Sequence, residues 1–188
     1  MLIGFIGSPG CGKSTTAFGL CYRLKQKGFA AEFFAEYARY QIMQNRVNGI
    51  AGNGGDEGQA KIYGQDSANA LFYRDHADSI TITDGSTLNC YFYGLESLDF
   101  EAESRKYDLL FYVPVTDVPL TVNDPNRVEN KQQILAMAER WETTIRPLVN
   151  RFDHIVELKG YPHHTTDQMV DQAMAVIQAH LSEQKLAA

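Results

Sequence analysis

Short apolar runs alternate along the chain with longer segments whose apolar side chains recur three and four positions apart. The short runs are typical of strands, and the longer segments indicate helices with one buried face. Strands are predicted at residues 2–6, 30–35, 79–83, 109–113 and 154–158. Helices are predicted at residues 14–26, 36–47, 59–76, 129–150 and 166–185. The fourth helix is expected to end or bend near Pro147, because proline cannot continue a helical hydrogen-bond ladder.

This alternation favours an α/β fold with a mostly parallel five-stranded sheet and helices on both faces, because parallel strands need a crossover that is usually a helix. The chain has 188 residues, a length that suits one compact domain, so a single domain is predicted over residues 1–188. Residues 48–58 are glycine-rich and contain little that packs, so they are expected to form a mobile loop.

Composition and charge argue against several classes of protein, including general nucleic-acid binders, zinc proteins and membrane proteins. The net charge of -6 gives no electrostatic reason for general nucleic-acid binding, although it leaves room for a local basic patch. Cys11, Cys21 and Cys90 are widely spaced and form no CxxC pair, so they indicate neither a disulfide framework nor a zinc site. We expect the three cysteines to be small residues packed in the core, and we expect the protein to lie in a reducing cytoplasm. The first apolar run stops at Gly7, too short for a signal peptide or a membrane span, and no membrane association is expected.

One motif carries specific chemistry. The segment Gly7-Ser8-Pro9-Gly10-Cys11-Gly12-Lys13-Ser14 fits the pattern G-x-x-x-x-G-K-S without a gap, and we call it the P-loop. Its glycines let successive N–H groups turn inward as an anion nest, and the following helix adds its positive end. Lys13 is expected to reach the β- and γ-phosphates of ATP, Ser14 to offer its hydroxyl to Mg²⁺, and Thr15 to close the nucleotide-binding segment. The competing interpretation is a glycine-rich turn with a surface lysine, but the motif follows a predicted strand and opens a predicted helix.

An acidic residue follows the third predicted strand. Asp84 comes directly after residues 79–83, at the sheet edge where open α/β sheets bind their ligands. It is a candidate for holding Mg²⁺ through water and for accepting the proton of an attacking hydroxyl. Gly85 would let a substrate approach closely. The alternative is that Asp84 caps a helix beginning near Ser86.

A second pair of candidates follows the second predicted strand. Glu36 is expected to face the same cleft, and Arg39 lies three residues later on the same helical face. Together they suggest a substrate clamp, with a carboxylate for hydroxyls or a base and a guanidinium for anionic groups. An ordinary surface ion pair is the alternative.

These elements resemble a known family. The P-loop, Glu36-Tyr37-Ala38-Arg39, Asp84 and Asp124-Pro125-Asn126-Arg127 resemble the ribosylnicotinamide kinase domain of the bacterial NAD-biosynthesis regulator, within the broader group of AAA-like P-loop nucleoside and nucleotide kinases. In that family an E-Y-x-R stretch follows the second strand, an aspartate ends the third, and a D-G-x-R element lies in a lid. Here the lid glycine is replaced by Pro125-Asn126. The resemblance implies a P-loop NTPase fold of the nucleotide-kinase type, ATP and Mg²⁺, with Glu36, Arg39, Asp84 and Arg127 as site residues.

The lid is also supported by its own composition. Residues 114–128 are polar, punctuated by proline and follow a predicted strand, and such a loop can close over a nucleotide and exclude water. Arg127 would then stabilise charge on the transferring phosphoryl group, with Lys13 as its partner in catalysis. A solvated arginine near a helix start is the alternative for Arg127.

The predicted activity is transfer of the γ-phosphoryl group of ATP to a hydroxyl or phosphate of a small nucleoside or nucleotide, held by Glu36, Arg39 and Asp84. Tyr37, Tyr63, Tyr91 and Phe92 are candidates for stacking on its base, with core packing as the alternative. A kinase acting on DNA ends or modified DNA bases remains open, as does an NTP-hydrolysing switch. The sequence does not define an oligomeric state, although the C-terminal helices have faces that could pair.

Overall fold

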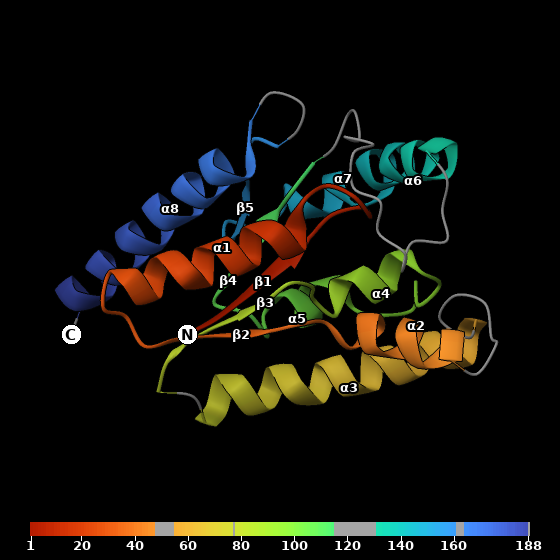
Figure 1. Ribbon diagram of the computed structural model, residues 1–188, viewed down its shortest axis with the longest axis horizontal. Helices are drawn as coiled ribbons and strands as arrows, with labels where there is room; N and C mark the ends of the chain where they lie inside the picture. The colour runs from red at the N-terminus through yellow and green to blue at the C-terminus, as the bar shows by residue number, and fades with distance from the viewer. Residues whose placement is uncertain (48–54, 77, 115–130, 161–163, 188) are drawn as a thin grey trace.

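The computed structural model describes residues 1–47, 55–76, 78–114, 131–160 and 164–187. Its centre is a five-stranded, wholly parallel sheet with the order β2-β3-β1-β4-β5 (Figure 1). The strands are β1 Leu2–Ile6, β2 Ala31–Phe34, β3 Ile80–Thr83, β4 Leu109–Tyr112 and β5 Ile155–Glu157. The predicted strands are all present, with ends that agree to within a residue, and the fold class is confirmed.

Helices cover both faces of the sheet, as the alternating pattern predicts (Figure 1). They are α1 Lys13–Gln26, α2 Tyr37–Val47, α3 Gly55–His76, α4 Leu88–Phe92, α5 Phe100–Ser104, α6 Lys131–Thr144, α7 Arg146–Val149 and α8 Thr166–Ala187. Strand β1 shows why both layers are needed. Its Ile3 and Phe5 pack in the cluster with α1 and α8, whereas its Leu2 and Ile6 pack in the cluster with α3, α4 and α5.

Several helix boundaries differ from the prediction. Helix α3 begins at Gly55, so the last four residues of the predicted loop 48–58 are helical, and residues 48–54 lie outside the described residues. The expected break near Pro147 is confirmed, since α6 ends at Thr144 and α7 begins at Arg146. Helix α4 was considered only as a helix beginning near Ser86, and α5 was not predicted, because five residues are too few to show a helical period.

The predicted packing of the cysteines is confirmed, since Cys11, Cys21 and Cys90 are all free and buried. Within the described residues, no helix combines the length and the apolar character that crossing a bilayer requires. The predicted lid at 114–128 falls outside the described residues except for Pro114, so its structure and its role stay a prediction.

Two glycines give a test of the packing around the central strand. A Cβ on Gly4 of β1 would lie 2.7 Å from Tyr107 Cε1 and 2.9 Å from Leu110 Cδ2. Gly4→Ala is therefore expected to lower the free energy of unfolding by about 1–3 kcal/mol, because an overpacked core must shift. Urea unfolding measures this change.

Gly64 provides the matched control, because it lies exposed in the middle of α3 and an added Cβ would meet nothing within 4 Å. Gly64→Ala is expected to raise the free energy of unfolding by roughly 0.5–1 kcal/mol, since alanine is the better helix former. Equal effects of the two substitutions would contradict the packing described for β1.

Candidate active site

The P-loop runs from the end of β1 to the first turn of α1. Gly10 and Gly12 adopt left-handed conformations, with φ of 83° and 93°, which side chains other than glycine rarely adopt. Gly12 is also the residue that precedes α1, and its carbonyl accepts the hydrogen bond of Thr16 N at 2.9 Å. The motif therefore has the conformation and the helix N-terminus that phosphate binding requires.

Lys13 lies back over the P-loop. Its Nζ donates to Gly7 O at 2.7 Å and to Ser8 O at 2.9 Å, and it lies 3.8 Å from Cys11 Sγ. Cys11 itself is fully buried beneath the loop. The Lys13 ammonium group, which is predicted to reach the phosphates, is thus held at the P-loop by backbone carbonyl oxygens of the loop.

Arg39 reaches the P-loop from α2. Its guanidinium donates from Nη2 to Ser14 Oγ at 3.0 Å, which joins α2 to the first turn of α1. The sequence predicted a clamp of Glu36 and Arg39 on the acceptor. Arg39 is also close enough to Glu36 to lower the pKa of its carboxyl group. The clamp on the acceptor stays a prediction, with a contact from Arg39 to the P-loop beside it.

Glu36 and Asp84 lie together because β2 and β3 are parallel neighbours. Phe34 pairs with Thr83 in the sheet, so the residues that follow the two strands meet at one edge. Glu36 N donates to Asp84 Oδ1 at 2.5 Å, and Asn89 Nδ2 donates to Glu36 Oε2 at 3.4 Å. Asp84 is only 1% exposed.

Two further observations define the roles of Asp84 and Gly85. Helix α4 begins at Leu88 and its N-cap is Thr87, so Asp84 is not the cap that was the alternative to a functional role. A Cβ on Gly85 would lie 2.1 Å from Glu36 Oε2, so the glycine is needed to let the Glu36 carboxylate approach the backbone.

A third carboxylate, Asp66 of α3, faces the same place. Its Oδ1 accepts a hydrogen bond from Tyr37 N at 3.0 Å, at the start of α2. Sequence reasoning missed Asp66, because it lies in the polar middle of a helix and no motif surrounds it. Only the packing of α3, which contacts α2, α4 and β1, brings it to the site (Figure 1).

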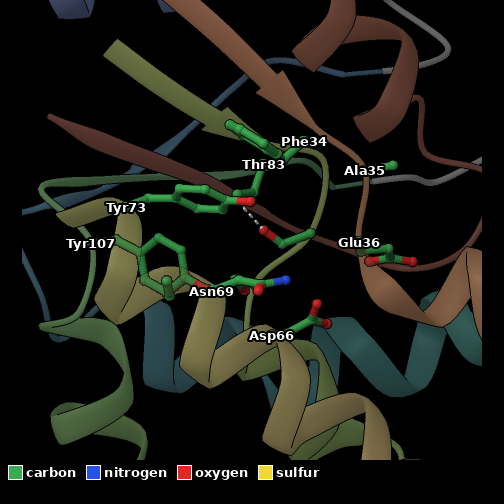
Figure 2. Close-up of a pocket in the computed structure, with 11 residues that line it drawn as sticks. Phe34, Ala35, Glu36, Asp66, Asn69, Tyr73, Thr83 and Tyr107 are labelled. Atoms are coloured by element: carbon green, nitrogen blue, oxygen red, sulfur yellow. Dashed lines mark hydrogen bonds between the residues drawn. The ribbon is translucent and has the colours of Figure 1, made fainter. Parts of the chain in front are cut away.

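Two of these carboxylates, Glu36 and Asp66, line a pocket with about 300 Å³ of empty space, part of it open to solvent. Figure 2 shows Glu36, Asp66 and Asn69 toward one end of this pocket and Tyr73 and Tyr107 toward the other. The lining residues are Phe34, Ala35, Glu36, Asp66, Asn69, Ala70, Tyr73, Thr83, Gly85, Ser86 and Tyr107. The pocket therefore combines an acidic end with an apolar wall, which is the usual makeup of a small-molecule site.

The aromatic residues of this wall are not the predicted ones. Phe34 and Tyr73 stack with their ring centroids 4.0 Å apart, and both line the pocket. Three of the four predicted aromatics pack or bond elsewhere: Phe92 against Trp141, Tyr91 against Phe100, and the Tyr63 hydroxyl on Glu103. The fourth, Tyr37, packs on Tyr40.

Burial and mutual repulsion perturb the carboxyl groups. Burial raises the pKa of Glu36 to about 7, the charge of Asp84 raises it as well, and the charge of Lys13 opposes the shift. Burial also raises the pKa of Asp66 to about 6, against the hydrogen bond from Tyr37 and with help from Asp84. Carboxyl groups that titrate near neutral pH are typical of catalytic sites.

The donor set fits Mg²⁺. The described residues contain no group of three or more His, Cys, Asp or Glu side chains placed to ligate a metal. Mg²⁺ requires no such group, because it keeps several waters and uses one or two protein oxygens together with the phosphates of a nucleotide. The Ser14 hydroxyl and the Asp84 carboxylate supply oxygens of that kind, and the repulsion between Asp84 and Glu36 favours a cation.

Arg127 is the one predicted site residue that the structure does not place, because residues 115–130 are outside the described part of the chain. The other predicted residues, from the P-loop through Thr15 to Glu36, Arg39 and Asp84, lie along one edge of the sheet or at the start of α1.

The wholly parallel sheet, the P-loop and the acidic residues at its carboxyl edge define a P-loop NTPase. A family model described as an AAA domain matches residues 2–160, and the chain belongs to this family. A solved structure of deoxyadenosine kinase from M. mycoides with bound dCTP has the same fold, with a TM-score of 0.54, 12% sequence identity and coverage of 95% of this chain and 100% of that chain. No curated protein matches the chain significantly.

The raised pKa of Glu36 gives a pH-dependent stability. A carboxyl group whose pKa rises from 4.5 in a model peptide to about 7 in the fold stabilises the fold fully below pH 4.5. This contribution is lost as the pH rises through 7. The free energy of unfolding is expected to fall by on the order of 3 kcal/mol across this range.

Glu36→Gln should remove most of this decline, because glutamine does not titrate, and Asp66 should account for what remains. Urea unfolding at pH 5, 6, 7 and 8 measures the slope. Glu57→Gln changes an exposed glutamate of α3 and should leave the slope as in the wild type. An unchanged slope in Glu36→Gln would contradict the assigned pKa.

Proposed function

We propose that residues 1–188 form one kinase domain that transfers the γ-phosphoryl group of ATP to a hydroxyl or phosphate of a nucleoside- or nucleotide-type acceptor. The observation that carries this proposal is the position of Glu36 and Asp84. They stand together at the carboxyl edge of the sheet, beside a pocket and next to a P-loop that Arg39 joins to α2. A site for an acceptor thus adjoins a site for a triphosphate.

The P-loop would hold the triphosphate. Its backbone N–H groups and the N-terminus of α1 face the phosphates, and Lys13 neutralises charge on the β- and γ-phosphates. Arg39 adds a second positive charge beside Ser14. The predicted lid residue Arg127 would contribute a third during transfer.

Ser14 and Asp84 would hold Mg²⁺, which supplies charge neutralisation between the β- and γ-phosphates when it is bound. Glu36 is then the group best suited to take the proton of the acceptor hydroxyl. It borders the pocket, and its pKa of about 7 matches the working pH of a general base. Asn89 and the backbone at Gly85 fix the position of its carboxylate.

A nucleoside-type acceptor has two kinds of support. The stacked Phe34 and Tyr73 give the pocket an apolar wall next to its acidic end. The resemblance of Glu36-Tyr37-Ala38-Arg39 and Asp84 to ribosylnicotinamide kinases adds nicotinamide riboside to the acceptors worth testing.

Transfer of label from γ-labelled ATP tests the function. The protein would be incubated with Mg²⁺ and a panel of nucleosides, nucleoside monophosphates, nicotinamide riboside, and plain and modified DNA. We expect label on a nucleoside-type compound. Label on DNA alone would identify a nucleic-acid kinase, and free phosphate that no acceptor accelerates would identify an NTP-hydrolysing switch.

Lys13→Ala is expected to lower transfer by at least about a thousandfold while the circular dichroism spectrum stays unchanged, because the residue neutralises transferring charge. Lys61→Ala changes an exposed lysine of α3 and serves as the matched control, with wild-type turnover. Near-normal turnover in Lys13→Ala would overturn the P-loop assignment.

The pH dependence of turnover separates the two carboxylates. For the wild type, kcat/KM is expected to rise with pH around 7, as Glu36 loses its proton. Glu36→Gln should lower kcat by roughly 10²–10⁴-fold and remove this rise, because no base remains. Asp84→Asn should lower the rate mainly by weakening the response to Mg²⁺. A normal pH profile in Glu36→Gln would move the role of base to Asp84.

A further inference from the structure

The acidic end of the pocket faces no lining cation. Glu36 and Asp66 both line the pocket, and none of the lining residues in the described part of the chain is Lys, Arg or His. The nearest cations, Lys13 and Arg39, lower the pKa of Glu36 but are not among the residues that line the pocket. Lys13 bonds to the P-loop carbonyls, and Arg39 donates to Ser14 Oγ. An anionic group placed in the pocket would therefore meet two lining carboxylates, and no cation among the described lining residues.

Asp66 is held in place from two sides. Tyr37 N donates to its Oδ1 at 3.0 Å. On the next residue of α3, Ser67 Oγ accepts from Lys106 Nζ at 2.7 Å, and Lys106 also forms a buried ion pair of 2.7 Å with Glu103. Tyr63 OH donates to the same Glu103 at 2.9 Å. Because these contacts fix α3 against α5, the Asp66 carboxylate is held in position beside an incoming anion.

The position of Asp66 matters for specificity because the charge is partly desolvated. Unlike an exposed carboxylate, it is screened little by solvent, so its effect on a nearby charge is large. An acceptor that presents an uncharged hydroxyl can donate a hydrogen bond to a carboxylate. A phosphate in the same place has no proton to donate at pH 8 and is repelled.

We propose that Asp66 is a specificity-determining residue that selects an acceptor whose reacting end is an uncharged hydroxyl and rejects the phosphorylated form. This inference rests on the proposed function and narrows it from nucleosides and nucleotides to nucleosides. A nucleoside 5′-monophosphate would place its phosphate where the nucleoside places its 5′-hydroxyl, beside Asp66 and Glu36. Asp66 acts on binding and not on the transferring group.

Paired binding measurements test the proposal. The panel nucleosides, nicotinamide riboside and the 5′-monophosphate of each would be titrated into the full-length protein by calorimetry at pH 8, above the pKa of about 6 that burial gives Asp66. The wild type is expected to bind at least one nucleoside and to bind its monophosphate at least about tenfold more weakly.

Asp66→Asn keeps an oxygen to accept from Tyr37 N but removes the charge, and the discrimination is expected to shrink by about tenfold. A purely structural role would weaken both ligands of a pair in parallel and leave their ratio unchanged. Asp75→Asn is the matched control. It removes an exposed carboxylate from the same helix, paired only with Arg74 at the surface, and should leave the ratio as in the wild type.

The outcomes separate this inference from the proposed function. Equal or tighter binding of the monophosphate by the wild type would overturn the inference, as would an unchanged ratio in Asp66→Asn, while transfer of label to any small acceptor would leave the kinase function standing. A protein that binds none of these compounds and labels no acceptor would overturn the function and the inference together.

Discussion

The hydrogen bond from Glu36 N to Asp84 Oδ1 joins the two strand ends around which the site is built. It exists because β2 and β3 are parallel neighbours in register, so the residues following Phe34 and Thr83 emerge at one edge. Gly85 is part of the same constraint, since a side chain there would occupy the space of the Glu36 carboxylate. The P-loop follows β1 on the other side of β3, so three consecutive strands of the sheet supply the site.

The arrangement concentrates negative charge at a cost to the fold. Glu36, Asp66 and Asp84 repel one another, and burial adds to the cost of ionising Glu36 and Asp66. Single hydrogen bonds from Glu36 N, Tyr37 N and Asn89 Nδ2 offset part of that cost. A bound cation or a ligand that donates a proton would neutralise or hydrogen-bond these carboxylates. Carboxyl groups with raised pKa values are therefore more typical of functional sites than of residues that stabilise the fold.

The elements that the sequence predicts are those whose signal is local. The P-loop is continuous in sequence and is identified by its motif. Strands β1 and β4 are buried along their whole length, so a hydrophobic run identifies them directly. Glu36 and Asp84 could be predicted as neighbours because each directly follows a strand. Asp66 could not, since its place depends on how α3 packs against the sheet. The contact from Arg39 to Ser14 was not predicted either, because it depends on the reach of a long side chain from α2 to α1.

The AAA domain family and the shared fold account for the P-loop better than for the pocket that we propose for an acceptor. The P-loop is tied to β1 and α1, and its geometry follows from the fold. The proposed acceptor pocket instead depends on side chains of α3 and of the end of β2, where Asp66, Asn69, Tyr73 and Phe34 lie. Helix α3 is held by hydrogen bonds of Tyr63 and Ser67 with Glu103 and Lys106, which form a buried ion pair at the end of α5 away from the P-loop. If the proposed function holds, substitutions on one face of α3 can change the choice of acceptor while the P-loop stays the same.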